Sequence, residues 1–136
     1  MKVFYIVALF FTLCSSCSSD TALDEYFLEL VPIESMDLPS EFIVNSTHSI
    51  PVYYKNPTNC NVFDSFYFEK NENIRTIAIQ TLKVVKQNCE ANNQTPVEVM
   101  LQFKPTELGM ITFKIWKGKT SSGIDIYDEI EIPVIE

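Results

Sequence analysis

The fold is decided by residues 105–134, which read PTELGMITFKIWKGKTSSGIDIYDEIEIPV. Pro105 and Gly109 bracket a corner, and the residues after it alternate between two kinds of side chain. One parity carries Ile111, Phe113 and Ile115, and the other carries Thr112, Lys114 and Trp116. Because successive side chains of an extended chain point to opposite faces, this alternation predicts a half-buried strand. A polar turn cluster at residues 118–123 leads to a second run, so the stretch predicts a hairpin.

The second strand of this hairpin shows the same alternation over a longer run. One parity is apolar except at Asp128, and we expect it to face the core with Ile124, Ile126, Ile130, Ile132 and Val134. The other parity carries Tyr127 among acidic side chains, and we expect it to face solvent. A bulge near Asp128 would reverse the faces of all the residues beyond it.

Similar runs elsewhere predict the remaining strands, at residues 26–33, 41–44, 49–55, 62–70, 74–85 and 96–104. Within the last of these, the expected inward parity is Val97, Val99, Leu101 and Phe103, and within residues 49–55 it is Ile50, Val52 and Tyr54. The intervening residues 34–39 are expected to bend. Residues 74–85 also have spacing that fits a helix, but their β-branched content and missing caps favour a strand.

The number and spacing of these strands predict the fold class. The chain has 136 residues, of which 46% are hydrophobic and 12% aromatic, enough for the core of a single domain. About seven short strands with frequent turns predict an all-β fold, an antiparallel β-sandwich.

The corner at the start of the hairpin resembles that of immunoglobulin-like domains. Glu107 and Gly109 match the acid-x-Gly-x-Tyr-x-Cys pattern of that corner, whereas Ile111 and Phe113 replace its Tyr and Cys. The resemblance covers the last third of the chain. It implies an immunoglobulin-like sandwich over residues 26–136, without implying antibody-like recognition.

The first residues predict export. Lys2 precedes an apolar run of 11 residues, Val3 to Leu13. Such a run is too short to cross a hydrocarbon core about 30 Å thick as a helix, and it is typical of a signal peptide.

The residues after this run resemble the lipobox of bacterial lipoproteins, because the small residues Ser15 and Ser16 directly precede Cys17. The resemblance implies a lipoprotein signal peptide over residues 1–16 and a lipid on Cys17. Residues 17–25 then form a short acidic tether. The alternative is an ordinary secretory signal cut near Ser16, with Cys17 unmodified.

Two cysteines remain in the exported part of the chain, Cys60 and Cys89. An even pair in an exported protein is a candidate disulfide, and two cysteines allow only one connectivity. The alternative is a catalytic thiol activated by His48, which is the only histidine and lies in a polar turn.

Charge and motifs exclude several functions. The net charge is −8 at pH 7, and an acidic chain without Lys or Arg clusters is not expected to bind nucleic acid. The motifs of serine hydrolases, zinc proteases, phosphate-binding loops and EF-hand calcium sites do not occur, so we expect neither an enzyme nor a metal or cofactor site. The carboxylates of Glu129 and Glu131 are interpreted as a solvated strand face.

Three side chains of the hairpin form the candidate binding surface. If the apolar parities point inward, Lys114, Trp116 and Tyr127 point outward on neighbouring strands. Trp and Tyr offer large contact areas at low entropic cost and are common in binding surfaces. The alternative is that Trp116 is tucked under a loop as part of the peripheral core.

Taken as a whole, the chain looks like the small lipoproteins of Bacteroidetes that join a lipobox to one immunoglobulin-like domain. The matching features are the acidic tether, the turn at residues 56–60 and the strands at residues 66–70 and 113–118. The resemblance implies a protein anchored to the outer membrane by lipid, facing the periplasm or the outside, and it brings no assigned activity. We therefore expect a non-enzymatic envelope module that binds a protein or a glycan.

A second resemblance keeps another function open. Asn56-Pro57-Thr58 resembles one loop of the chagasin-like inhibitors of cysteine proteases, which are also immunoglobulin-like. The other two loops of that family have no counterpart here: the sequence has no Gly-x-Gly-Gly, and Lys114-Ile115-Trp116 stands in place of Arg-Pro-Trp.

Overall fold

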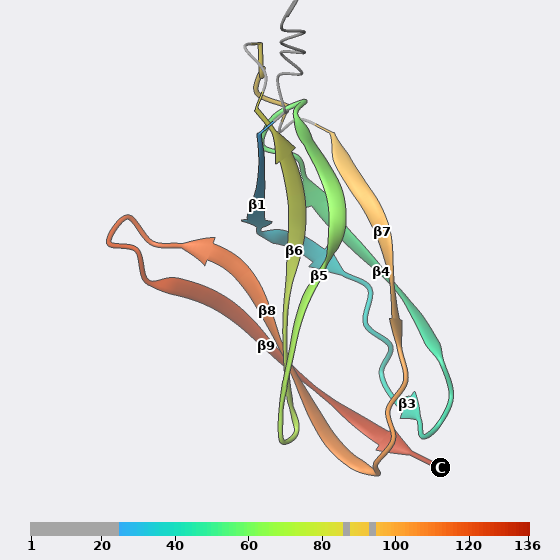
Figure 1. Cartoon of the computed structure of the whole chain (residues 1–136). Coiled ribbons are helices and arrows are strands. Elements are labelled where there is room, and N and C mark those ends of the chain that lie inside the picture. The colour runs from blue at the N-terminus through green and yellow to red at the C-terminus, as the bar shows by residue number, and fades with distance from the viewer. Residues whose placement is uncertain (1–24, 86–87, 93–94) are drawn as a thin grey trace, which may run out of the picture.

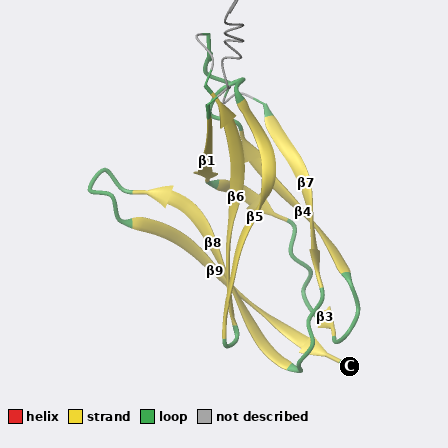
Figure 2. Ribbon diagram, in the orientation of Figure 1, coloured by secondary structure: helices red, strands yellow, loops and turns green. Residues whose placement is uncertain are grey.

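The computed structural model describes residues 25–85, 88–92 and 95–136 and shows strands joined by loops in these ranges (Figures 1 and 2). The leader at residues 1–16, Cys17 and most of the tether lie outside the described residues. The strands are β1 (Tyr26–Val31), β2 (Ile33–Met36), β3 (Phe42–Ile43), β4 (His48–Lys55), β5 (Asn61–Asn71), β6 (Ile74–Val84), β7 (Pro96–Phe103), β8 (Gly109–Lys119) and β9 (Asp125–Ile135).

The strands form two sheets, which confirms the all-β sandwich. β1, β3, β5, β6, β8 and β9 belong to one sheet, and β2, β4 and β7 form the other in that order. Two pairs are parallel, β6 with β8 and β3 with β9, whereas all the others are antiparallel. β8 runs parallel to β6 because the chain crosses to β7 in the opposite sheet between them and then returns.

The core lies between the two sheets, where the predicted inward parities meet. Ile50, Val52 and Tyr54 of β4 are buried, and so are Ile111, Phe113 and Ile115 of β8. On β7 burial increases along the strand, from half-buried Val97 and Val99 to buried Leu101 and Phe103. Phe113 packs against Phe103 and Phe42, with ring centroids 5.2 and 5.7 Å apart, so an aromatic cluster fills one end of the sandwich.

The first predicted strand is divided between the sheets. Residues 26–31 form β1 in the larger sheet, and Ile33–Met36 form β2 in the smaller one. The expected bend at residues 34–39 was therefore wrong in its first part. Pro32 separates the strands, and because proline has no N–H to continue a ladder, it suits the point where the chain changes sheets. This division gives nine strands in the described residues, where the sequence indicated eight runs and a sandwich of about seven strands.

The predicted parity of β9 holds in only one half of the strand. Ile132 and Val134 are buried, but Ile124, Ile126 and Ile130 are 65%, 42% and 41% exposed. Ile124 and Ile126 are exposed because the distal halves of β8 and β9 extend away from the sandwich (Figure 1). Ile130 lies opposite the buried Phe113 but on the outer strand of that pair, which β3 borders only at residues 134 and 135. The irregularity considered near Asp128 is found on the neighbouring strand instead, as a register shift of β8 between Trp116 and Gly118, opposite Tyr127 and Ile126. Gly118, expected in the turn, belongs to β8 instead.

Candidate functional site

A groove of about 540 Å³ lies where the β8–β9 hairpin diverges from the larger sheet. β8 pairs with β6 only through residues 112–115, because β1 occupies the same edge of β6 beyond that point. The hairpin must therefore leave the sheet, and the space beside it is the groove. Its floor is Thr76 and Ala78 of β6, and its walls come from four other strands, with Leu28, Glu29, Leu30, Tyr67, Trp116, Lys119, Asp125 and Tyr127.

Trp116 is held in a fixed orientation in this groove. The side chain is half-buried, and its Nε1–H donates to Oδ1 of Asp125 at 2.8 Å. The Nζ of Lys119 lies 2.8 Å from the same oxygen. The hydrogen bonds from Lys119 and then Trp116 lower the pKa of Asp125. A fixed indole loses little entropy when a ligand packs on it, which suits a binding surface.

Tyr127 lies beside Trp116, because the two residues are partners in the β8–β9 ladder. The Nζ of Lys114 lies 4.4 Å from the centre of the Tyr127 ring and 3.9 Å from Oε1 of Glu129. Trp116 and Tyr127 both line the groove, whereas Lys114 contacts Tyr127 without lining it. The structure thus brings the three predicted side chains together on one face, with Lys114 packed against the ring of Tyr127 outside the groove.

Sequence reasoning missed the opposite wall of the groove, formed by Leu28 and Leu30 of β1 and Tyr67 of β5. Leu28 is 62% exposed, and Tyr26 and Phe27 beside it are also exposed. The available signal was the run Tyr26-Phe27-Leu28, which is apolar on both parities although Pro32 places it near a sheet edge. Such a run is unusual for a solvated edge strand and indicates a contact surface.

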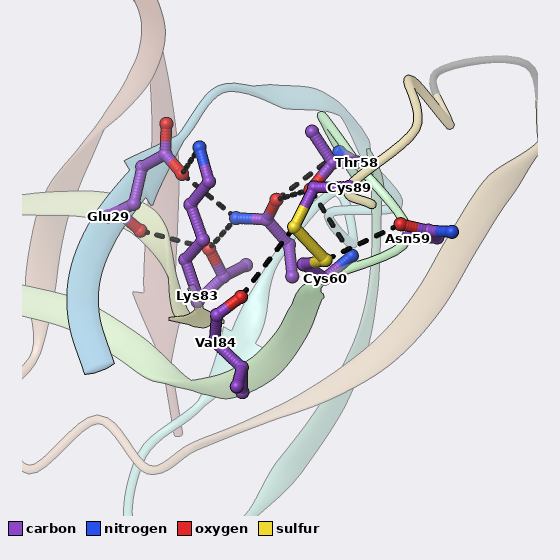
Figure 3. A network of polar contacts seen from close by, with 9 residues as sticks. Glu29, Thr58, Asn59, Cys60, Lys83, Val84 and Cys89 are labelled. Atoms are coloured by element: carbon purple, nitrogen blue, oxygen red, sulfur yellow. Dashed lines mark hydrogen bonds and ion pairs between the residues drawn. A yellow bond between two sulfur atoms is a disulfide. The ribbon is translucent and has the colours of Figure 1, made fainter. Parts of the chain in front are cut away.

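The end of the sandwich near the start of β1 is a structural network rather than a reactive site. Cys60 and Cys89 form the predicted disulfide, with sulfurs 2.05 Å apart. Beside it, the buried Asn61 donates from Nδ2 to Glu29 Oε2 at 2.9 Å and to Thr81 Oγ1 at 3.0 Å (Figure 3). Because both thiols are consumed by the bridge, the catalytic-thiol alternative is excluded.

A smaller cavity of about 310 Å³ lies at the other end of β6, beside Arg75. Arg75 is buried, and burial lowers the pKa of its guanidinium. Its Nη1 donates to the backbone carbonyls of Glu72 and Ile74, at 2.7 and 3.0 Å. These bonds satisfy backbone carbonyls at the β5–β6 turn, where Glu72 has a φ of 52°. We therefore assign Arg75 a structural role.

Within the described ranges, no three His, Cys, Asp or Glu side chains group in a way that could hold a metal ion. In the same ranges, no helix has the length and apolar character needed to cross a bilayer. Glu129 and Glu131 are exposed on β9.

Comparison with known proteins identifies no relative: no family model, no curated protein and no solved structure matches the chain. The function of the groove is therefore inferred from its own side chains.

Proposed function

We propose that this chain is a non-enzymatic binding module of the cell envelope, anchored by a lipid on Cys17, and that the groove is its binding site. The observation that carries the proposal is the convergence of exposed apolar side chains from β1 and β5 and half-buried aromatic rings from β8 and β9 on one concave surface, over a floor formed by β6. Monomeric proteins rarely expose contiguous apolar surface unless something binds there. Concave apolar sites with a few polar groups are the usual form of a binding site.

The side chains of the groove favour a protein partner over a glycan. Aromatic rings such as Trp116 and Tyr127 suit both kinds of ligand. Leu28 and Leu30, however, offer only apolar contact, and the indole N–H of Trp116 is already bonded to Asp125. A surface of this kind resembles the apolar centre of a protein–protein interface, where aromatic anchors contribute most of the binding energy.

Replacing Trp116 and Tyr127 together with alanine is expected to abolish partner binding while the domain stays folded, since both side chains are only half-buried. Loss of two central aromatic anchors weakens an interface by about 2 kcal/mol or more for each. The measurement is affinity purification from envelope fractions, with quantitative mass spectrometry, of the wild-type and variant chains. Tyr53→Ala, on the other sheet, is the control for loss of an aromatic ring. A partner that the double variant retains would place the binding site elsewhere.

The proposed anchor rests on the lipobox-like residues before Cys17 and on the disulfide, which fits an exported protein. Two or more acyl chains attach a protein stably to a membrane. Cys17→Ser is therefore expected to move the protein from the detergent phase to the aqueous phase in detergent partitioning. Cys14→Ser should leave partitioning unchanged, because Cys14 departs with the leader. A wild-type chain found in the aqueous phase would contradict the anchor.

A further inference from the structure

One edge of β1 is free of any strand in the part of the chain that the structure describes, and its hydrogen-bonding groups can be assigned residue by residue. β1 pairs with no described strand except β6. The N–H of Val85 donates to the carbonyl of Glu25 at 2.9 Å, so these residues form a hydrogen-bonded pair. Bonded and non-bonded pairs alternate along an antiparallel ladder, so Phe27 and Glu29 also bond to β6.

It follows that the N–H and C=O groups of Tyr26, Leu28 and Leu30 point away from β6. A bond on the other edge of β6 supports this assignment. Val84 lies opposite Tyr26 but donates its N–H to the carbonyl of Cys60, so it does not bond to β1. The free edge of β1 thus presents donors and acceptors at every second residue.

The groove runs along this free edge. Leu28, Glu29 and Leu30 all line it, although the side chains of consecutive strand residues point to opposite faces. Three consecutive residues can line one groove only where it follows the backbone. The groove therefore combines unpaired backbone groups with the apolar side chains of Leu28 and Leu30, and the aromatic rings of the hairpin form the other wall.

We propose that an extended segment of a partner protein adds to β1 as a further strand, with apolar side chains at alternate positions lying in the groove. This inference rests on the proposed function and specifies the partner's conformation. In strand addition, backbone hydrogen bonds supply affinity and pockets for alternate side chains supply specificity. The groove has both parts.

The composition of β1 supports this role. Exposed edge strands are usually protected from pairing by lysine, proline or a bulge. β1 reads YFLELV, contains none of these within its length, and pairs with β6 in unbroken register. Its single charged side chain, Glu29, accepts a hydrogen bond from Asn61 and forms an ion pair with Lys83 of β6 at 3.8 Å. This carboxylate is therefore directed toward β6 and does not protect the free edge.

The position of the hairpin favours a lone strand over a second copy of this chain. β8 and β9 project on the side of the sandwich where β1 lies (Figure 1), and they supply the opposite wall of the groove. A single strand can lie between β1 and this wall, whereas the edge of a second folded sandwich would meet the hairpin.

Charge indicates the character of the partner segment. Glu29 is paired with Lys83 and Asp125 with Lys119, so the charge that a partner meets is the net −8 of the whole chain. A segment with Lys or Arg at its ends therefore complements the site.

The test uses the chain from residue 17 onward with Cys17→Ser, which contains all the described strands. A phage-displayed library of linear peptides is selected against it, and the best peptide is synthesised. Leu28→Pro removes the outward N–H of residue 28 without breaking a bond to β6, and proline is tolerated in edge strands. Leu28→Ala keeps that N–H and is the matched control. We expect Leu28→Pro to bind the peptide at least tenfold more weakly than Leu28→Ala.

Amide hydrogen exchange measured by NMR gives a second readout that needs no variant. In the free chain the amides of Leu28 and Leu30 should exchange quickly, and those of Phe27 and Glu29 slowly. Bound peptide should slow exchange at Leu28 and Leu30 at least tenfold.

Three results would overturn strand addition: no selected peptide, a bound peptide that leaves both leucine amides unprotected, or equal binding by Leu28→Pro and Leu28→Ala. Slow exchange at these amides in the free chain, with dimers in sedimentation, would assign the edge to a second copy. If the envelope partner still depends on Trp116 and Tyr127 in any of these cases, the proposed function stands without strand addition. If the envelope partner does not depend on Trp116 and Tyr127, both the proposed function of the groove and strand addition are contradicted.

Discussion

Phe113→Ala is expected to lower the free energy of unfolding by about 3–5 kcal/mol, the range for removing a large aromatic side chain from a packed core. Phe113 is fully buried between the sheets, and its ring packs against Phe42 and Phe103. Since single domains are stable by only about 5–15 kcal/mol, this loss would leave a marginal or unfolded chain. Urea denaturation followed by circular dichroism measures it.

The control for this variant is Phe27→Ala, which removes the same side chain from an exposed position on β1. We expect a change below about 1 kcal/mol there, because little apolar area leaves the protein interior. Similar losses for the two variants would mean that the core does not lie between the sheets as described.

Replacing Cys60 and Cys89 together with serine is expected to lower the free energy of unfolding by about 3–4 kcal/mol. The bridge joins residues separated by 29 positions, and a closed loop of that length restricts the unfolded chain by about this amount. The measurement is urea denaturation with and without a thiol reductant. Reductant should destabilise the wild-type chain and leave the double variant unchanged, whereas equal stability of the two chains without reductant would contradict the prediction.

Much of the core could be predicted from the sequence because it depends on alternation alone. β4, β7 and the proximal half of β8 each turn one face toward the opposite sheet, so their apolar parity coincides with their buried parity. The predicted burial of β9 was wrong in its distal half, because alternation indicates which residues share a face and does not indicate whether another sheet covers that face. Ile124 and Ile126 share the parity of Ile132 but lie beyond the sandwich, whereas Ile130, opposite Phe113, lies on the outer strand of the pair.

The candidate site was predicted on one side only. Trp116 and Tyr127 are neighbours through a hairpin, which is local in sequence and can be read from alternation. Leu28 and Tyr67 reach the groove because β1 and β5 both pair with β6, at separations of about 50 and 10 residues along the chain. The pairing of distant strands depends on the whole topology, including the change of sheet at Pro32, and no local pattern encodes it.

The position of β1 directly after the N-terminal segment also determines how the domain transmits force. Any pull on that segment enters the sandwich at Glu25 and passes first to the ladder between β1 and β6. The disulfide joins Cys60 to Cys89 and does not include β1, so only hydrogen bonds and side-chain packing hold this strand. In the lipid-anchored protein that we propose, a partner seated along β1 would therefore be connected to the membrane through the strand that it contacts, and one strand would carry the tension between the two.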